Sequence, residues 1–472
     1  MSSIRETIAV LGDWLASIVF FAFEFGGVQI NLIVLWLLAG MIFFTLRLGF
    51  INFRGFPIAI KTLRGQFASS TAPGLFTPFQ ALATALSGTV GLGNIAGVAL
   101  AIALGGPGAA FWMIVVGFLA MSLKFAEVTL AVKYRRIAED GDILGGPMWY
   151  LKRGLEQKGL GRLGLYLANL YAIFALFALI QIFQVNQSYA QVSAVMGLEG
   201  SVGAALAYGF AIAALAALVI VGGARWVGAL TSRIMPFMCG LYLFSTAAIL
   251  VANWQSVGDA IALIVRDAFS PSAAVGGVLG AFVAGMRRAV YSNEAGVGTA
   301  TIAHAMVKTD EPVSEGFVAL IEPFVDTVIV CTATALLIVV TGVWDDGYDD
   351  ITMTSAAFGS VASWFPSLLA ICVVLFALST VLATGFYARQ VCGYLFRDKP
   401  WATRIYLGIF CGALPLGTLA DVSSIIAIVD SFFFLLTVPN LIGLYLLRGV
   451  IVDELSNFRR HPIRDEAPDR ET

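Results

Sequence analysis

The sequence predicts an all-α membrane protein that crosses the bilayer about eleven times. Of its 472 residues, 59% are hydrophobic and 12% are charged, and the mean hydropathy is +0.88. A soluble globular chain carries about twice that share of charged residues. Apolar runs of roughly twenty residues, the length needed to cross a bilayer, recur along the whole chain. Two of these runs contain clusters of glycine, which predicts that their helices are interrupted.

The predicted spans follow the apolar runs in order. They cover residues 30–49, 76–104, 108–131, 163–190, 202–223, 229–251, 274–304, 315–342, 364–392, 402–419 and 422–447. Residues 8–25 are also apolar, but Asp13 and Glu24 interrupt them. We expect this stretch to form a helix at the membrane surface, within an N-terminal segment of residues 1–29.

Basic residues divide unevenly between two alternating sets of loops. The rich set begins with Arg47 and Arg54 and ends with the tail at residues 448–472. The alternate loops contain almost no Lys or Arg, and one of them reads WDDGYDD, residues 344–350. Positively charged loops stay on the cytoplasmic side, so the N-terminus is predicted outside and the C-terminus inside. This consistency supports eleven spans, because a missed helix would reverse the pattern after it.

The chain offers little for catalysis, disulfides or metal clusters. Its five cysteines lie in apolar segments without paired spacing and are interpreted as small buried residues. The histidines, His304 and His461, are too few for a histidine metal site. We see no cleaved signal peptide, no G-x-x-x-x-G-K-[ST] loop for ATP, and no indication of a nucleic-acid partner. We therefore expect no catalytic residues and no enzyme, and we make no prediction of oligomeric state.

The stretch TALSGTVGLGNIAGVA, residues 84–99, is the most informative part of the sequence. It places Gly88, Gly91 and Gly93 among polar residues inside an apolar span. Glycine in a membrane helix usually marks close helix packing. The accompanying polar residues instead favour an unwound segment, which is tolerated at membrane depth only where it is buried in protein or lines a cavity.

The seventh span is the counterpart of this interrupted span. It carries Gly276, Gly277, Gly280 and Gly285. The two spans lie five apart, so two five-helix units that start at them have opposite topology, as in inverted-repeat transporters. We predict one repeat at residues 76–251 and the second at 274–447, with the span at 30–49 outside this core.

An interrupted helix has a specific chemical use. The half-helix that starts near Gly93 presents free N–H groups and a positive dipole end to an anion. The half-helix that ends near Ser87 presents free carbonyls to a cation such as sodium. An amino acid zwitterion carries both charges, so the two ends together suit an amino acid.

Several long strings resemble the alanine or glycine:cation symporter family, also called sodium:alanine symporters. These strings are TALSGTVGLGNIAGVA, GGPGAAFWM, KFAEVTLAVKYR, GGPMWYL, RRAVYSNEAGVGTATIAHA and FVDTVIVCTATAL, within residues 80 to 340. The resemblance implies a leucine-transporter-like inverted repeat that imports a small neutral amino acid with sodium, by alternating access. It also implies a multi-pass protein in the lipid bilayer of a plasma membrane, of the bacterial inner-membrane type.

The resemblance also implies a set of binding residues. The broken second span would surround the substrate's carboxylate and amine with Thr89, Gly91, Leu92, Gly93 and Asn94. Gln184, in IQIFQVNQ, would face the substrate, while Phe282 and Met286 share one helix face and would wall the pocket. Sodium would lie between the carbonyls of Ser87 and Val90 and the hydroxyls of Ser379 and Thr380.

One position departs from the family pattern. In FALSTVLATGFYA, Thr384 stands where members of the family carry a tryptophan that closes the small pocket. Thr384 is one helical turn from Thr380, so both side chains are expected on one face. Replacing an indole by threonine removes a large volume. We therefore hypothesise that the pocket admits a larger or more polar neutral amino acid than alanine or glycine.

Charged residues inside the spans leave further alternatives open. Lys124 and Glu127 lie three residues apart and are interpreted as a local ion pair. The seventh span carries Arg287, Arg288 and Glu294, which form either a cytoplasmic gate or a static pair.

Glu322 and Asp326 share one face of the eighth span. Either one of them holds a proton, or neighbouring hydroxyls and amides satisfy both. Proton-coupled amino acid transport is therefore the alternative function. An ion channel is a more distant one, because no wide polar stripe runs along several spans.

Overall fold

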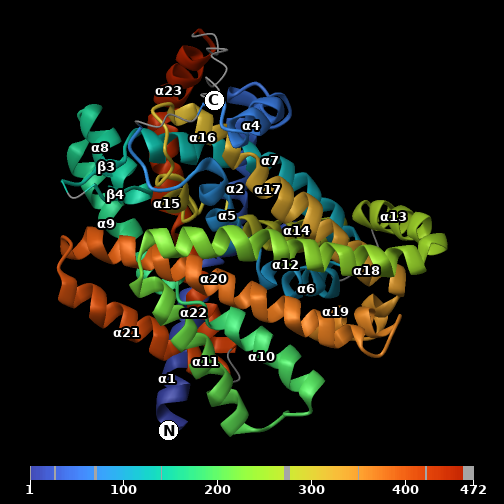
Figure 1. Cartoon of the computed structure of the whole chain (residues 1–472). Helices are drawn as coiled ribbons and strands as arrows, with labels where there is room; N and C mark the ends of the chain where they lie inside the picture. Colours follow the sequence, from blue (N-terminus) through green and yellow to red (C-terminus); the bar gives the residue numbers. More distant parts are fainter. Residues whose placement is uncertain are drawn as a thin grey trace, which may run out of the picture.

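The computed structural model describes residues 2–25, 28–67, 72–139, 141–270, 277–348, 350–419 and 423–460. Within these ranges the chain is mostly helical, with two short antiparallel hairpins. Figure 1 shows α1 at one end of the molecule and α23 at the other. The predicted Gly276 and the end of the tail, with His461, lie outside the described residues.

The N-terminal segment combines a helix and a hairpin. The helix α1 (Ser2–Val19) is followed by β1 (Ala22–Phe25), which pairs with β2 (Val28–Asn31). The predicted helix over residues 8–25 is therefore wrong beyond Val19. The stretch that pairs alternates apolar and polar residues, a period of two that favours a strand over a helix. The helix α1 packs against α22 (Ser423–Leu435).

The chain from residue 32 to 252 contains the first group of helices. In order these are α2 (Leu32–Arg47), α3 (Ile51–Arg54), α4 (Phe56–Leu63), α5 (Pro78–Thr89), η1 (Leu92–Asn94), α6 (Ala96–Gly105), α7 (Gly108–Lys133), α8 (Pro147–Gln157), α9 (Gly161–Ala178), α10 (Ile182–Met196), α11 (Val202–Val221) and α12 (Ala224–Ala252). The hairpin of β3 (Arg136–Ile137) and β4 (Ile143–Leu144) lies between α7 and α8.

The remaining helices follow α12. They are α13 (Trp254–Ala268), α14 (Gly277–Asn293), α15 (Thr301–His304), α16 (Pro312–Ala319), α17 (Ile321–Pro323), the π-helix η2 (Phe324–Cys331), α18 (Thr332–Thr341), η3 (Val343–Asp345), α19 (Ile351–Gly359), α20 (Phe365–Phe396), α21 (Pro400–Gly417), α22 and α23 (Thr437–Arg460). The segments from α16 to α18 run on as one helix of 30 residues, Pro312–Thr341.

The described residues contain seven helices long and apolar enough to cross a membrane. The bent pair of α5 with η1 and α6 would make an eighth. The other predicted spans correspond to α2, a shorter apolar helix, and to α14 and α21. The structure is thus a polytopic helical membrane protein, while the count of eleven stays a prediction.

Loops that were predicted to share a side of the membrane do meet in space. Lys133, at the end of α7, forms a 2.6 Å ion pair with Glu454 of α23. Arg135 donates to the carbonyls of Pro73, at 2.8 Å, and Thr309, at 2.6 Å. On the opposite side, the amide of Gly108 donates to the carboxylate of Asp267 at 2.8 Å. Asp267 lies in α13, between the two predicted repeats. In both cases the contacting residues belong to loops or helix ends that the predicted spans place on the same side of the membrane.

The helix α14 is continuous through Gly280 and Gly285, so the predicted interruption at these glycines is wrong. A Cβ atom on Gly285 would lie 2.3 Å from the carbonyl oxygen of Ala109 in α7. This glycine therefore allows two helices to pack closely. The seventh span is interrupted further along, after α14 ends at Asn293.

Candidate functional site

The first helix break lies where the sequence predicted it. The helix α5 begins with a capping box between Thr77 and Gln80 and ends at Thr89. Val90 leaves the helical conformation with φ −72° and ψ 98°, and the chain turns by 62° into η1 and α6. An interruption between Ser87 and Asn94 is thereby confirmed.

Two backbone amides at this break are bound by side chains instead of by helix carbonyls. The amide of Gly91 donates to Oδ1 of Asn94 at 2.9 Å, and the amide of Leu92 donates to Oε1 of Gln184 at 2.9 Å. In a continuous α-helix each amide would pair with the carbonyl four residues earlier. The end of α5 therefore has carbonyls without their helical donors.

Asn94 connects the first break to α14 and η2. Its Nδ2 donates to Oδ1 of Asp326 at 2.6 Å and to Oγ of Ser292 at 2.9 Å. Ser292 in turn donates to Oδ2 of Asp326 at 2.5 Å, and all three side chains are buried. The side chain of Asn94 thus holds the shape of the break and does not line the cavity described below.

The second break joins α14 to α15. Glu294 has a positive φ of 53°, and Gly296 and Gly298 have φ of 88° and 85°. A non-glycine residue rarely adopts the left-handed conformation, and it does so where the surrounding structure fixes it, often at a functional site. Glu127 of α7 supports this segment by accepting the amide of Gly296 at 3.0 Å.

A third break divides the predicted span at 163–190. The helix α9 ends at Ala178 and α10 begins at Ile182. Neither glycine nor proline marks this point, so the pattern of helix breakers gives no warning of it. The available signal is the amide side chains of Gln181 and Gln184 in an otherwise apolar run.

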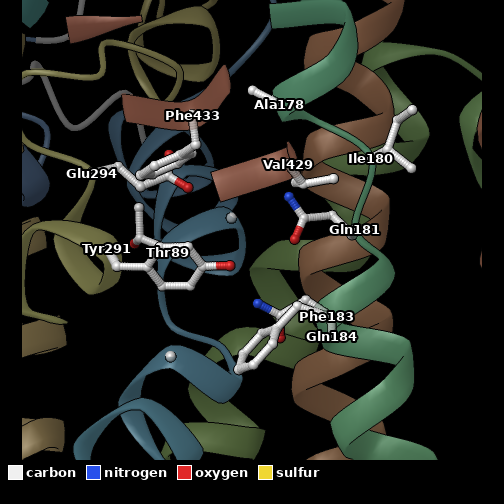
Figure 2. Close-up of a pocket in the computed structure, with 12 residues that line it drawn as sticks. Thr89, Ala178, Ile180, Gln181, Phe183, Gln184, Tyr291, Glu294, Val429 and Phe433 are labelled. Carbon is white, nitrogen blue, oxygen red and sulfur yellow. The ribbon is translucent and has the colours of Figure 1, made fainter. Parts of the chain in front are cut away.

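The three breaks and α22 surround one cavity. Its lining residues are Gly88, Thr89, Gly93, Ala178, Ile180, Gln181, Phe183, Gln184, Tyr291, Glu294, Val429 and Phe433. Figure 2 shows Thr89, Tyr291 and Glu294 on one wall, facing Gln181 and Gln184 on the other. The centre of a water molecule has about 20 Å³ available. This is little more than the space for one water, so an amino acid requires the walls to move.

Hydroxyl groups of α5 and α20 lie beside the first break. A Cβ atom on Gly91 would be 2.8 Å from Oγ1 of Thr380, so this hydroxyl directly adjoins the break. Within the described part of the chain, Oγ1 of Thr380 and Oγ of Ser87 are buried without a hydrogen-bond partner. Oγ of Ser379 donates to the carbonyl of Phe376 at 3.0 Å, which leaves its lone pairs available. A hard cation prefers oxygen ligands of this kind, and Thr380 is the one whose position beside the break the contacts give.

Besides Asn94, five residues that the resemblance implies as substrate-binding are not among those lining the cavity: Gly91, Leu92, Phe282, Met286 and Thr384. The ring of Phe282 packs edge-on against Trp112 of α7, with 5.1 Å between centroids. Met286 is buried in the same helix, α14. Oγ1 of Thr384 donates to the carbonyl of Thr380 at 2.7 Å, within α20. The wall on α14 comes instead from Tyr291, since α7 covers the helix face that carries Phe282.

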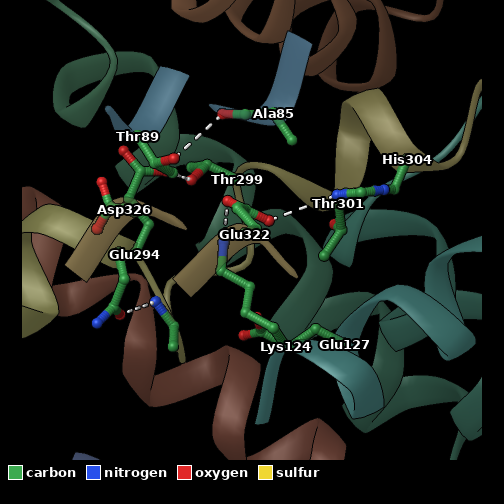
Figure 3. Close-up of polar contacts among 12 residues, drawn as sticks. Ala85, Thr89, Lys124, Glu127, Glu294, Thr299, Thr301, His304, Glu322 and Asp326 are labelled. Carbon is green, nitrogen blue, oxygen red and sulfur yellow. Dashed lines mark hydrogen bonds and ion pairs between the residues drawn. The ribbon is translucent and has the colours of Figure 1, made fainter. Parts of the chain in front are cut away.

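A buried ionic cluster joins α7, α15, α16 and α17, next to the second break (Figure 3). Lys124 pairs with Oε1 of Glu322 at 2.9 Å, and His304 lies between Glu322, at 3.4 Å, and Glu315, at 2.6 Å. The predicted pair of Lys124 with Glu127 is therefore wrong. Spacing along one helix cannot reveal a partner on another helix, and Glu322 lies on α17.

The charged residues of the seventh span do not pair with one another in the described structure. The guanidinium of Arg287 lies 4.2 Å from the ring centroid of Phe20, and that of Arg288 lies 5.8 Å from that of Tyr291. Glu294 instead accepts a hydrogen bond from the hydroxyl of Thr299. The predicted pairing of these arginines with Glu294, as a gate or as a static pair, is wrong.

Comparison with known proteins identifies relatives along almost the whole chain. Residues 17–472 match the sodium:alanine symporter family. A protein of Methanococcus maripaludis named sodium/alanine symporter AgcS is 39% identical over 428 residues, which are 89% of this chain and 93% of the relative. A Bacillus subtilis protein named probable sodium/glutamine symporter GlnT is 31% identical over 434 residues, 91% of this chain and 88% of the relative.

The fold also resembles that of a solved transporter. The crystal structure of MhsT in complex with L-phenylalanine aligns with a TM-score of 0.54 at 15% identity, covering 78% of this chain and 88% of MhsT. The likeness confirms the predicted leucine-transporter-like fold with a broken helix, while the division into two five-helix repeats stays a prediction.

Proposed function

We propose that this chain, which belongs to the sodium:alanine symporter family, imports a small neutral amino acid together with sodium by using its first helix break to bind both. The observation that carries the proposal is the state of the backbone at that break. Carbonyls at the break lack their helical donors, and at Gly91 the break adjoins the buried hydroxyl of Thr380, which has no partner among the described residues.

The sodium ion is assigned to the carbonyl end of α5. The helical donor for the carbonyl of Ser87 would be the amide of Gly91, which binds Asn94 instead. The donor for the carbonyl of Val90 would be the amide of Asn94, which binds the carbonyl of Gly91 at 3.1 Å. We propose these two carbonyls, with the hydroxyls of Thr380 and Ser379, as the ligands of a sodium ion.

The substrate carboxylate is assigned to the amide end of the break. The amides of Leu92 and Gly93 begin the half-helix, where an anion is stabilised by free N–H groups and by the helix dipole. Gln184 holds the Leu92 amide, so its side chain has to release that amide when the carboxylate binds. Thr89 and Gln181 offer further polar contacts on the cavity walls.

Transport then follows from movement of the predicted repeats, residues 76–251 and 274–447, against each other around the occupied site. One sodium ion crossing a potential of ~100 mV releases about 2.3 kcal/mol. A tenfold sodium gradient adds roughly 1.4 kcal/mol, so one ion supports accumulation of a few hundredfold. One sodium per amino acid is therefore sufficient to drive import.

The orientation is proposed from the loops rich in Lys and Arg. Some of these loops contact one another, as in the ion pair of Lys133 with Glu454, which agrees with their lying on one side. By the positive-inside rule this side is cytoplasmic, with the C-terminus inside and the N-terminus outside. We propose a bacterial-type inner membrane as the location.

The coupling is tested by uptake of radiolabelled alanine into liposomes that contain the purified protein. An inward sodium gradient is expected to drive accumulation above equilibrium, and collapse of the gradient is expected to release the alanine. A potassium gradient of the same size serves as the control. Uptake driven by a proton gradient alone, with no response to sodium, would contradict the proposal and support proton coupling.

The substrate range is tested by competition. Because Thr384 replaces the family's tryptophan, we expect glutamine or leucine to inhibit alanine uptake in this protein as well as alanine and serine do. The variant Thr384→Trp refills the volume and is expected to narrow the range toward alanine and glycine. Thr384 lies outside the lining of the closed cavity, so this expectation requires that Thr384 face the substrate once the walls have moved. A wild-type profile restricted to glycine and alanine would defeat this hypothesis.

A further inference from the structure

Glu294 is the only acidic side chain among the cavity-lining residues of the described structure, and that lining has no Lys, Arg or His. Its side chain is 6% exposed, and Figure 2 shows its carboxylate directed into the cavity. The carboxylate accepts the Thr299 hydroxyl, and both residues belong to the second break. The positive φ of 53° at Glu294 is part of the same irregular segment.

The charge of this carboxylate has no direct counter-ion within the described residues. Lys124, a buried cation whose charge acts on Glu294, is bound to Glu322 at 2.9 Å. Arg287 and Arg288 lie against aromatic rings, and none of the ion pairs formed by the described residues includes Glu294. A buried carboxylate without a paired cation is costly, so a site that faces a cavity in this way attracts a cation from the cavity.

We propose that Glu294 binds the α-ammonium group of the transported amino acid. This inference rests on the proposed function and deepens it, because it assigns the two ends of the zwitterion to the two broken helices. The carboxylate lies at the Leu92 and Gly93 amides of the first break, and the ammonium lies at Glu294 of the second. Sodium is left to the carbonyl and hydroxyl oxygens around Thr380.

This arrangement makes the amine a requirement for binding. A substrate that lacks the ammonium leaves Glu294 as an uncompensated buried charge beside it. We therefore infer that the site selects α-amino acids against 2-hydroxy acids and simple carboxylic acids of the same size. The selection arises from the second break and is independent of pocket volume.

The test compares L-alanine with L-lactate, which carries a hydroxyl in place of the ammonium. Wild type and Glu294→Gln are reconstituted, and inhibition of labelled alanine uptake by each ligand is measured at saturating sodium. We expect Glu294→Gln to weaken alanine binding by about 10- to 100-fold, the usual effect of losing a charged hydrogen bond. Lactate binding is expected to change little or to improve, so the preference for alanine over lactate collapses.

Two variants keep the result interpretable. Glu294→Asp retains the charge and is expected to keep most of the preference for alanine over lactate. This variant keeps the test informative if Glu294→Gln folds poorly. Glu156→Gln makes the same chemical change on the exposed face of α8 and is expected to behave as wild type.

The outcomes separate this inference from the proposed function. If alanine and lactate weaken equally in Glu294→Gln, or if the half-saturating sodium concentration rises while the preference is kept, the ammonium assignment is overturned. If wild type itself shows no sodium-driven uptake, the proposed function fails instead.

Discussion

Replacing Gly91 with alanine is expected to lower sodium-driven uptake by about tenfold or more, and to destabilise the fold by about 1–3 kcal/mol because the site is overpacked. The new Cβ atom would lie 2.8 Å from Oγ1 of Thr380 and 3.0 Å from Oε1 of Gln184. Both distances are too short for a methyl group, so Thr380 and Gln184 have to move. One is a proposed sodium ligand and the other holds an amide of the carboxylate site, so one methyl group disturbs both sites. The measurement is the initial rate of alanine uptake against sodium concentration.

The matched control lies six residues further along. Gly97 is in α6, and a Cβ atom there would meet no atom within 4 Å. Gly97→Ala makes the same substitution in the same predicted span, and we expect it to retain wild-type uptake. Equal effects of the two variants would mean that backbone flexibility, and not the space beside Thr380, determines the result.

The variant Thr380→Val is expected to raise the half-saturating sodium concentration by about 10- to 100-fold, because a cation loses one oxygen ligand. Valine has nearly the shape of threonine. Since the hydroxyl of Thr380 has no partner among the described residues, its removal breaks no hydrogen bond within them. The fold is therefore expected to be unaffected. Sodium dependence of alanine uptake measures the effect, with thermal unfolding of the purified variant as the check on stability.

Thr341→Val is the control for this substitution. Oγ1 of Thr341 donates to the carbonyl of Leu337 at 2.9 Å within its own helix, α18. We expect the sodium dependence of this variant to match wild type. A Thr380→Val protein with unchanged sodium dependence would remove Thr380 from the proposed cation site.

The fold class was predictable because hydropathy and loop charge are properties of local sequence, and each span adds independent support for the same conclusion. Hydropathy identifies spans, and the distribution of Lys and Arg fixes their parity. Contacts such as Gly108 with Asp267 agree with that parity. The N-terminal hairpin was missed because a short apolar run with period-two alternation was interpreted by composition alone.

The first break was predictable because glycine and polar residues coincide there. The second was misplaced, since Gly285 serves close packing against Ala109 and the break occurs at Glu294 to Gly298. Glycine occurs for two different reasons: it lets two helices pack closely, and it allows a backbone with positive φ. The sequence pattern alone does not distinguish these two reasons. The third break has neither signal, and only the amide side chains of Gln181 and Gln184 in an apolar run indicate it in the sequence.

Partners across helices were the least predictable feature. Lys124 binds Glu322, which lies 198 residues away in sequence, and Asn94 binds Asp326 across 232 residues. Phe282 and Met286 share a helix face as expected, but which neighbour covers that face depends on tertiary packing. The role of Glu294 likewise emerges only when the second break is placed against the cavity.

The most direct measurement is a high-resolution structure of the protein with alanine and sodium bound. We predict the alanine carboxylate on the amides of Leu92 and Gly93, with the side chain of Gln184 turned away. A sodium ion is predicted between the carbonyls of Ser87 and Val90 and the hydroxyl of Thr380. Alanine bound elsewhere, with residues 84–99 forming one continuous helix, would contradict the account.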